Sequence, residues 1–310
     1  MRLMVPKDVT AGTILATNLT EDAPLWDGDT AYAVGAVVRQ DDTHRRYKAL
    51  LASNAGKLPS EHCSGAAPVW SDAGVCNDWA PFDGAINSVA VATAGSATID
   101  ATLDSSRCDT VAIFGLADAA TVDLEMRDGF GAIVYSGTIP LEKFEILNWY
   151  QYFFAEFKYR RDLTQALPMY GASTLRVVIH GVGALKPSVG TILPCRAHEL
   201  GRTLYANSDF GFTDYSTDDE DKWGRTDLEQ GPTAKSAAID FRVDTDDFDY
   251  VVGLIESVRG RLAVWDCNNP APQQQTPFER AIILGRVRDF KPPVEGPTVT
   301  TFSLEIRGVP

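Results

Sequence analysis

The residues most capable of chemistry are acidic, and they are concentrated in one stretch of the C-terminal third of the chain. Residues 209–249 contain thirteen Asp and Glu against four Lys and Arg, and the densest run is Asp218-Asp219-Glu220-Asp221. Paired carboxylates can serve glycoside hydrolysis, and carboxylate oxygens are ligands for calcium. The spacing of a calcium-binding loop, with its obligatory glycine turn, is absent after Asp214. A solvated acidic loop is therefore the favoured interpretation, with hydrolysis and calcium binding as alternatives.

No other group of residues forms a recognisable catalytic or metal-binding motif. The sequence lacks a nucleophile elbow, a zinc-protease motif and a phosphate-binding loop. The four histidines (44, 62, 180 and 198) are scattered, and His180 ends an apolar strand, where a structural role is usual. The five cysteines show no CxxC pair or zinc spacing. We therefore predict no catalytic residue, no metal, no cofactor and free thiols, although a disulfide between Cys63 and Cys76 remains open.

The charge and the hydropathy of the chain disfavour two kinds of partner. The 310 residues include 28 Lys and Arg against 42 Asp and Glu, which gives a net charge of −14. Binding to a phosphate backbone depends on cationic side chains, so we predict no nucleic-acid partner. No stretch approaches the roughly 18 apolar residues of a membrane span, and residues 1–15 do not resemble a signal peptide. We therefore predict no membrane insertion.

Short strands are the elements that must position these residues. Alternating runs bounded by turn residues indicate antiparallel sheets with one buried face, and Asp128-Gly129 indicates a hairpin. Residues 249–259 have the apolar spacing of a helix, with acidic residues at its N-terminal end. The aromatic segment 147–163 is interpreted as an insertion of loop and strand with short helical turns. The expected strands include 96–103, 111–116, 121–126, 132–135, 174–179, 281–287 and 300–306.

The length and the composition shifts indicate a modular, mostly β protein. Residues 1–20 form an N-terminal lead-in strand or arm. Residues 21–84 form a small module rich in Trp, Gly and Asp, for which we expect three strands. Residues 85–200 contain at least six short strands, for which a β-sandwich or jelly roll is the natural arrangement. Residues 201–310 form a C-terminal β domain with one helix.

The small module carries a recognisable order of residues: Trp26, Thr30-Ala31-Tyr32, Gly35, Val37-Val38, Tyr47-Lys48-Ala49, Pro59 and Trp70. This order resembles the family 5/12 carbohydrate-binding modules of the chitin-binding type. The resemblance implies a short three-stranded sheet with a sugar-binding face. It makes Trp26, Tyr32, Tyr47 and Trp70 candidates for glycan or partner contact, while the core of so small a module is their other possible place. Leu50-Leu51-Ala52 stands where chitin binders carry exposed aromatic residues.

The two larger segments also resemble known families. The layout of 85–200 is similar to galactose-binding-like jelly rolls that recur in phage tail proteins, although fold likeness alone does not establish sugar binding. In 201–310 the ordered motifs are Leu200-Gly201, Asp214-Tyr215-Ser216, a helix, Val264-Trp265-Asp266 and Leu304-Glu305-Ile306-Arg307-Gly308. This set resembles the C-terminal part of tail proteins of long-tailed bacteriophages.

The resemblance implies a non-enzymatic virion structural protein of a tail tip or baseplate, made in the host cytoplasm. Its expected partners are other tail or baseplate proteins and copies of itself, together with attachment to host cell-surface glycans. Two alternatives remain: a glycan-processing tail hydrolase, and a pure glycan-binding adhesin.

Overall fold

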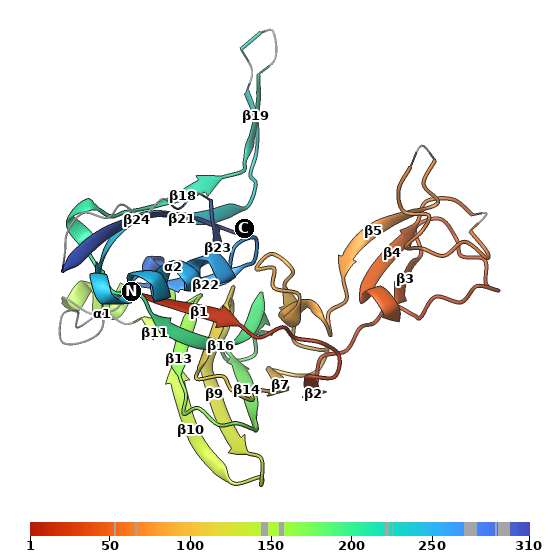
Figure 1. The fold of residues 1–310 in the computed structure, drawn as a ribbon. Helices are drawn as coiled ribbons and strands as arrows, with labels where there is room; N and C mark the ends of the chain where they lie inside the picture. The colour runs from red at the N-terminus through yellow and green to blue at the C-terminus, as the bar shows by residue number, and fades with distance from the viewer. Residues whose placement is uncertain are drawn as a thin grey trace.

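The computed structural model describes residues 1–52, 54–65, 67–143, 148–154, 158–220, 223–224, 226–269, 278–288, 290 and 298–310. Over these residues the protein is mostly β, and a body made of two packed sheets carries two projections (Figure 1). The short 3-10 helices of this part of the chain are η1 (Asp41–Thr43), η2 (Ala80–Phe82), η3 (Tyr205–Asn207), η4 (Thr245–Asp247) and η5 (Glu279–Ala281).

One antiparallel sheet runs through the body and takes strands from both ends of the chain. Its order is β13-β8-β16-β1-β22-β23-β24-β21-β17, and β18 also pairs with β21. The segments 85–200 and 201–310 therefore share one continuous sheet. Its strands are β1 (Arg2–Pro6), β8 (Thr110–Phe114), β13 (Leu163–Ala166), β16 (Thr191–Glu199), β17 (Arg202–Thr203), β18 (Asp209–Asp214), β21 (Thr233–Asp244), β22 (Ala263–Asp266), β23 (Ile282–Val287) and β24 (Val299–Gly308).

Strand β1 lies at the centre of this sheet. Leu3 is opposite His198 of β16 on one side and opposite Trp265 of β22 on the other. The side chains of Leu3 and Met4 point to opposite faces, as alternation along a strand requires, and both are fully buried. Residues 1–20, expected as a lead-in strand or arm, thus supply the strand that connects the two halves of the body.

A second, five-stranded sheet packs against one half of the first and forms a β-sandwich. Its order is β10-β9-β14-β7-β2. The inward-facing residues of both sheets, such as Ile99, Leu103, Ile113 and Val177, form one buried core. Strict alternation of buried and partly exposed residues along β7 shows that the other face is turned to solvent. The strands are β2 (Ile14–Thr17), β7 (Thr98–Asp104), β9 (Ala119–Asp128), β10 (Ile133–Pro140) and β14 (Ser173–Gly181).

The C-terminal half of the long sheet is covered by a helix. Helix α2 (Phe248–Ser257) buries Val251 and Ile255 against Phe241, Phe302 and neighbouring residues of the sheet. Asp249 in the first turn of α2 complements the positive end of the helix dipole. The apolar spacing of residues 249–259 therefore predicts this helix correctly.

The long sheet curls until its two halves meet at a cluster of charges. Lys235 of β21 places its Nζ 2.5 Å from Oδ2 of Asp162, the residue before β13. The same ammonium donates to the carbonyl oxygens of Glu279 at 2.9 Å and Ile282 at 3.0 Å. The carboxylate of Glu279 in turn pairs with Lys143. This cluster, which we call the joint, ties the β13 edge of the sandwich to the C-terminal half.

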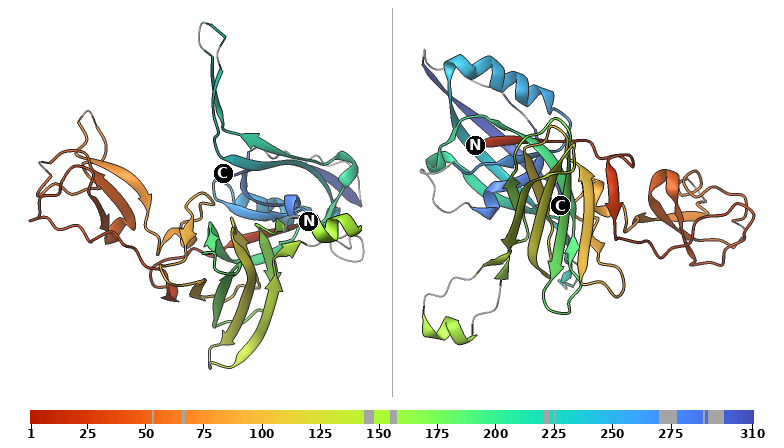
Figure 2. Two further views of the ribbon diagram at one scale, coloured as in Figure 1. Left: turned by 180° about the vertical axis from the view of Figure 1, so that it is seen from behind. Right: turned by 90° about the horizontal axis from the view of Figure 1, so that it is seen from below.

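The N-terminal module forms one of the two projections and stands apart from the body in the views of Figures 1 and 2. Its sheet has three strands, as the sequence predicts, and their order is β3-β4-β5. Residues 76–84, assigned to the module from sequence, instead reach the sandwich, where Ala80 and Phe82 join the main core. The strands are β3 (Val37–Gln40), β4 (Arg45–Ala49) and β5 (Trp70–Val75).

The second projection is a two-stranded hairpin, made of β19 (Thr217–Glu220) and β20 (Thr226–Glu229). We call residues 217–229 the arm; it points away from the body in Figure 1 and in the left view of Figure 2. The Asp218–Asp221 run was expected as a loop, but Asp218 to Glu220 are strand residues. The remaining elements are β6 (Ala90–Val91) with β15 (Ser188–Val189), β11 (Glu142–Lys143) with β12 (Lys158–Tyr159), and α1 (Trp149–Phe154).

The sequence-based strands are present in the sandwich and in the C-terminal half. β7, β8, β9, β10, β14, β23 and β24 overlap the seven runs expected from alternation. The Asp128-Gly129 turn joins β9 and β10, and Asp128 Oδ1 accepts the N–H of Phe130 and of Ala132, both at 2.9 Å. The aromatic segment 147–163 contains α1 and β12, in keeping with strand and helical turns, although residues 147 and 155–157 lie outside the described part.

Candidate interaction surfaces

The four aromatic residues proposed for glycan contact converge on one small core in the module. Tyr47 and Trp70 are buried there with Val38, and Trp26 and Tyr32 are partly buried against them. Tyr32 and Trp70 meet edge to face with ring centroids 5.8 Å apart. The indole N–H of Trp70 donates to the carbonyl oxygen of Lys57 at 2.9 Å. These contacts hold the three strands together, because large aromatic side chains bury much area per residue in a small module.

Stacking on a sugar ring needs an exposed aromatic face, and the module offers aliphatic side chains instead. Trp70 is 0% and Tyr47 2% exposed, whereas Leu50 and Leu51 are 39% and 46% exposed. Leu25, Val34 and Val37 are exposed as well. Aliphatic side chains suit contact with another protein, since apolar area buries well against any apolar partner. Of the four aromatic candidates, Trp26 and Tyr32 are the ones with part of their surface accessible.

The module is joined to the body by a hydrogen-bonded clasp. One carboxylate oxygen of Glu21 accepts the N–H of Asn77 at 2.7 Å, which ties the entering chain to the leaving chain. The side-chain amide of Asn77 donates to the carbonyl oxygens of Thr20 and Val91. The rings of His44 and Trp79 stack with centroids 3.8 Å apart. These contacts link the module to the sandwich through both of its connecting segments.

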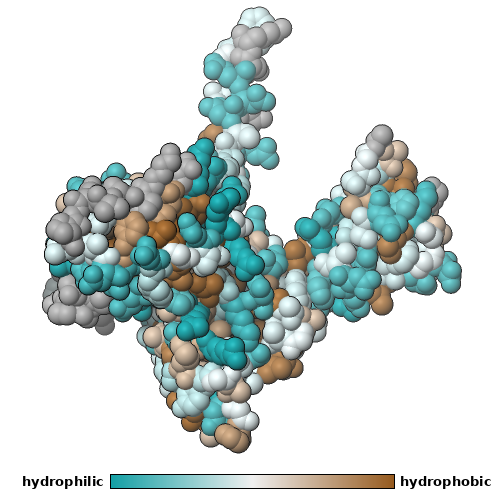
Figure 3. All heavy atoms as spheres, viewed as in Figure 1, coloured by the Kyte–Doolittle hydropathy of each residue, from teal (hydrophilic) through white to brown (hydrophobic). Residues whose placement is uncertain are grey.

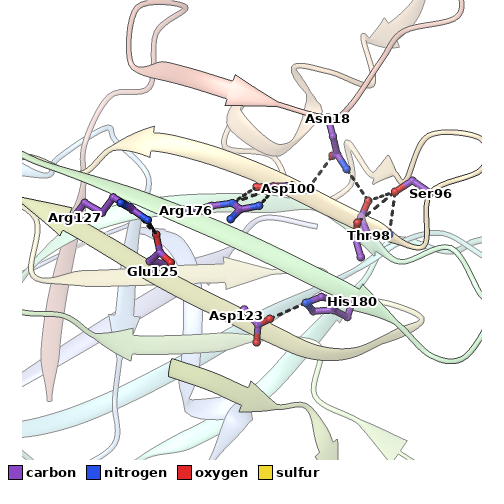
Figure 4. Close-up of polar contacts among 9 residues, drawn as sticks. All are labelled: Asn18, Ser96, Thr98, Asp100, Asp123, Glu125, Arg127, Arg176 and His180. Carbon is purple, nitrogen blue, oxygen red and sulfur yellow. Dashed lines mark hydrogen bonds and ion pairs between the residues drawn. The ribbon is translucent and has the colours of Figure 1, made fainter. Parts of the chain in front are cut away.

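The outer face of the five-stranded sheet carries a group of polar contacts (Figure 4). Arg176 of β14 makes a two-pronged contact with Asp100 of β7, with N–O distances of 2.5 and 3.0 Å. Arg127 and Glu125 of β9 pair at 2.7 Å. Each of these charges therefore has an opposite charge on the same face. We interpret this face as a solvated sheet surface whose charges are already neutralised.

His180 lies on this same face and is paired with a carboxylate. Its Nε2 is 2.8 Å from Oδ2 of Asp123 on β9. The hydroxyl of Thr138, followed by the imidazole of His180, lowers the pKa of Asp123. Both side chains are about 40% exposed: 39% for His180 and 42% for Asp123. The pair fits the structural role expected for this histidine.

The described acidic residues of the arm have no opposite charge paired with them in this way. Residues 217–229 include six acidic and two basic residues. All four residues of β19 are exposed, and the register places Asp219 opposite Asp227. Within the described residues, no ion pair involves Asp218, Asp219, Glu220 or Glu229. Leu228 is exposed on the same hairpin.

Hydrogen bonds fix the direction in which the arm leaves the body. The N–H of Tyr215 donates to the carbonyl oxygen of Pro232 at 3.1 Å. Asp214 accepts the N–H and the hydroxyl of Ser216, at 2.9 and 2.6 Å, and these bonds lower the pKa of Asp214. The N–H of Gly231 donates to the hydroxyl of Ser216 at 3.0 Å. A Cβ at Gly231 would lie 2.3 Å from the carbonyl oxygen of Tyr215, so only glycine fits this crossing.

The cysteines are free thiols, and Cys63 and Cys76 are not joined. Burial raises the pKa of Cys108 to about 11 and of Cys76 to about 12. Burial also raises the pKa of Cys195 and Cys267. A buried thiol with a raised pKa holds little thiolate, which is the nucleophilic form. These four cysteines therefore pack as small apolar side chains.

Over the described ranges, no group of three or more His, Cys, Asp or Glu residues is gathered in a way that could hold a metal ion. Within the same ranges, no helix has both the length and the apolar character needed to cross a membrane. Comparison with protein-family models gives no match to this chain, and comparison with curated proteins gives none either.

Sequence reasoning missed the residues that fix the projections. Glu21 and Asn77 form the clasp, and Tyr215, Ser216 and Gly231 form the base of the arm. In the sequence, Asp214-Tyr215-Ser216 stands out only through the resemblance to phage tail proteins. Asp followed two residues later by Ser is a common turn pattern, and that pattern was the available signal.

Proposed function

We propose that this chain is a structural component of a bacteriophage tail tip or baseplate, which makes assembly contacts through its two projections. The observation that carries the proposal is the arm. An isolated two-stranded hairpin is marginally stable in water, yet here one is extended into solvent with β19 fully exposed. Such an element gains stability when a partner covers it. The partner is expected in a phage tail, because the sequence of 201–310 resembles tail proteins of long-tailed phages.

The body supports the same role. One continuous sheet, a sandwich and the joint form a base on which the module and the arm are mounted. A rigid base with projections of fixed direction suits an assembly of many copies, in which each subunit must meet its neighbours at the same angle. The exposed aliphatic residues of the module, Leu50 and Leu51 among them, suit contact with protein.

The proposal is tested in virions that carry the gene for this chain. We expect peptides of the chain in purified particles by mass spectrometry, and antibody labelling at one end of the tail in electron micrographs. Absence of the chain from purified particles would refute the proposal. Release of reducing sugar from host glycans by the purified chain would support the hydrolase alternative instead.

Two deletions separate assembly from attachment. Replacement of residues 217–229 by a short Gly–Ser turn is expected to block tail assembly, whereas Phe130→Ala, which removes a fully exposed aromatic from another hairpin, is the matched control. Replacement of residues 24–75 distinguishes the roles of the module. Loss of assembly identifies the module as a structural contact, and loss of adsorption with normal particles identifies it as a host-attachment element.

A further inference from the structure

A pocket of about 400 Å³ lies beside the base of the arm, between the end of β24, the end of β23 and the turn after α2. Its lining includes Tyr215, Arg261, Leu262, Arg286, Arg307 and Val309. No Asp or Glu side chain lines this pocket, although the chain as a whole has a net charge of −14. Pro310, the last residue of this sequence, also lines it, and the three arginines outnumber its single terminal carboxylate. We call it the arginine pocket. It is a local concentration of positive charge on an acidic protein.

Two arginines of the pocket repel each other, and a bound anion would reduce this repulsion. The register of β23 and β24 places Arg286 directly opposite Arg307, and like charges in opposite positions destabilise a strand pair. No carboxylate in the described part of the chain forms an ion pair with Arg261, Arg286 or Arg307. The pocket therefore favours an anion from outside, because guanidinium groups bind carboxylates through paired, charge-assisted hydrogen bonds.

One of the arginines is already held in position. Nη2 of Arg307 donates to the hydroxyl of Tyr215 at 2.9 Å. The guanidinium carbon of Arg307 also lies 5.9 Å from the centroid of the same ring. Tyr215 is fixed in turn by its hydrogen bond to Pro232 at the base of the arm. A donor held in this way loses less conformational entropy when it binds an anion.

The same chain carries a matching acidic element that does not reach this pocket. Tyr215, at the base of the arm, lines the pocket, but the arm itself runs away from the body (Figures 1 and 2). Much of its coloured surface is hydrophilic (Figure 3), although Leu228 is exposed on it as well. Asp218, Asp219 and Glu220 lie on β19, where every residue is exposed.

We propose that the arginine pocket receives the acidic arm of a second copy of this chain. The inference rests on the proposed structural role and names the partner of the arm. Carboxylates of one copy would pair with Arg286 and Arg307 of the next, and the unneutralised charge on both elements would be removed. Because the pocket and the arm are different surfaces, the contact is head to tail. Repetition of a head-to-tail contact produces a closed ring or a helical array.

The test is a charge exchange between two variants of the full chain. In the first variant, Asp218→Lys and Asp219→Lys make the arm basic; in the second, Arg286→Glu and Arg307→Glu make the pocket acidic. Sedimentation velocity measures association of the wild type, of each variant alone, and of the two variants mixed. Asp8→Lys and Arg196→Glu are matched controls, because both residues are exposed and lie outside the arm and the pocket.

The wild type is expected to associate at low salt and to dissociate at high salt, since exposed charge pairs are screened. Each charge variant alone should associate about tenfold more weakly or worse, and the mixture should recover association. The control variants should behave as the wild type. Circular dichroism verifies that each variant is folded, and the salt titration of the wild type needs no substitution.

Three results would overturn the inference. The wild type is monomeric at every salt and protein concentration measured, or the mixture fails to recover association, or inorganic phosphate binds to the pocket without weakening association of the wild type. None of these results implies that the chain is absent from purified virions. Failure of this inference can thus be distinguished from failure of the structural role itself.

Discussion

The joint between the two halves of the sheet gives the sharpest prediction about stability. Lys235→Met keeps an apolar stem of similar length but removes an ammonium with three partners: Asp162, the carbonyl of Glu279 and the carbonyl of Ile282. The side chain of Asp162 is 10% exposed, so the substitution leaves a largely buried carboxylate without its cation. We expect this variant to be less stable and the loss to be localised at the joint.

The size of the effect follows from the geometry. Removal of one partner of a fully buried ion pair costs about 3–5 kcal/mol. The Lys235 side chain is 33% exposed, which reduces the contribution of the ion pair through solvent screening. Loss of the two hydrogen bonds to carbonyl oxygens adds about 1 kcal/mol each. We therefore expect the free energy of unfolding to fall by about 3 kcal/mol.

Urea denaturation measures this change without screening the charges, and hydrogen exchange of the β13 and β21 amides locates it. Asp162→Asn in the Lys235→Met background should recover part of the loss, because it removes the unpaired charge. Lys7→Met is the matched control, since its partner Asp104 is 34% exposed, and it should cost at most about 1 kcal/mol. A loss for Lys235→Met no larger than that of Lys7→Met would refute the reasoning.

Three further predictions concern the module, the arm and acid stability. Trp70→Ala should unfold the module alone, because the loss of about 3–5 kcal/mol matches the stability that so small a core supplies; limited proteolysis should then cut only within residues 24–75. Gly231→Ala should make residues 214–232 sensitive to protease, whereas Gly171→Ala, with open space around the new Cβ, should not. Burial acts to raise the pKa of Asp104, but hydrogen bonds from Lys7 and Ser106 outweigh it, and the folded-state pKa is lowered. The stability that the Asp104 carboxylate contributes is thus present above the ordinary Asp pKa of about 3.9 and is lost as the pH falls through the lowered pKa. The difference in the free energy of unfolding between wild type and Lys7→Met, measured in urea, should therefore vanish below that range.

The spacing of apolar residues in the sequence predicts those strands and helices whose buried face follows from their own residues. β7 and β24 alternate between buried and more exposed residues along most of their length, and the same alternation is visible in their sequences. Helix α2 shows its apolar face and its acidic first turn in the same way. The module was predicted through a few aromatic residues, and Tyr47 and Trp70 do define its core.

Features that depend on distant pairing were not predictable in this way. Nothing in residues 2–6 indicates that Leu3 lies between His198 and Trp265. The arm lacks the apolar alternation that marks a strand, and all four residues of β19 are exposed. Arg286 and Arg307 are 21 residues apart in the sequence, and only the register of β23 and β24 brings them together. The arginine pocket therefore has no sequence signature.

The central place of β1 also has a consequence for the order of folding. Arg2 is opposite Glu199 on one edge of the strand and opposite Asp266 on the other. The strand that completes both halves must therefore wait until residues nearly 200 and more than 260 positions later have been synthesised. Contacts of such long range slow folding, because the loop must close before the contact stabilises it. Residues 2–6 therefore complete their strand pairing late in folding. A truncated chain that ends before β22 would leave one edge of β1 unpaired and open to pairing with other chains.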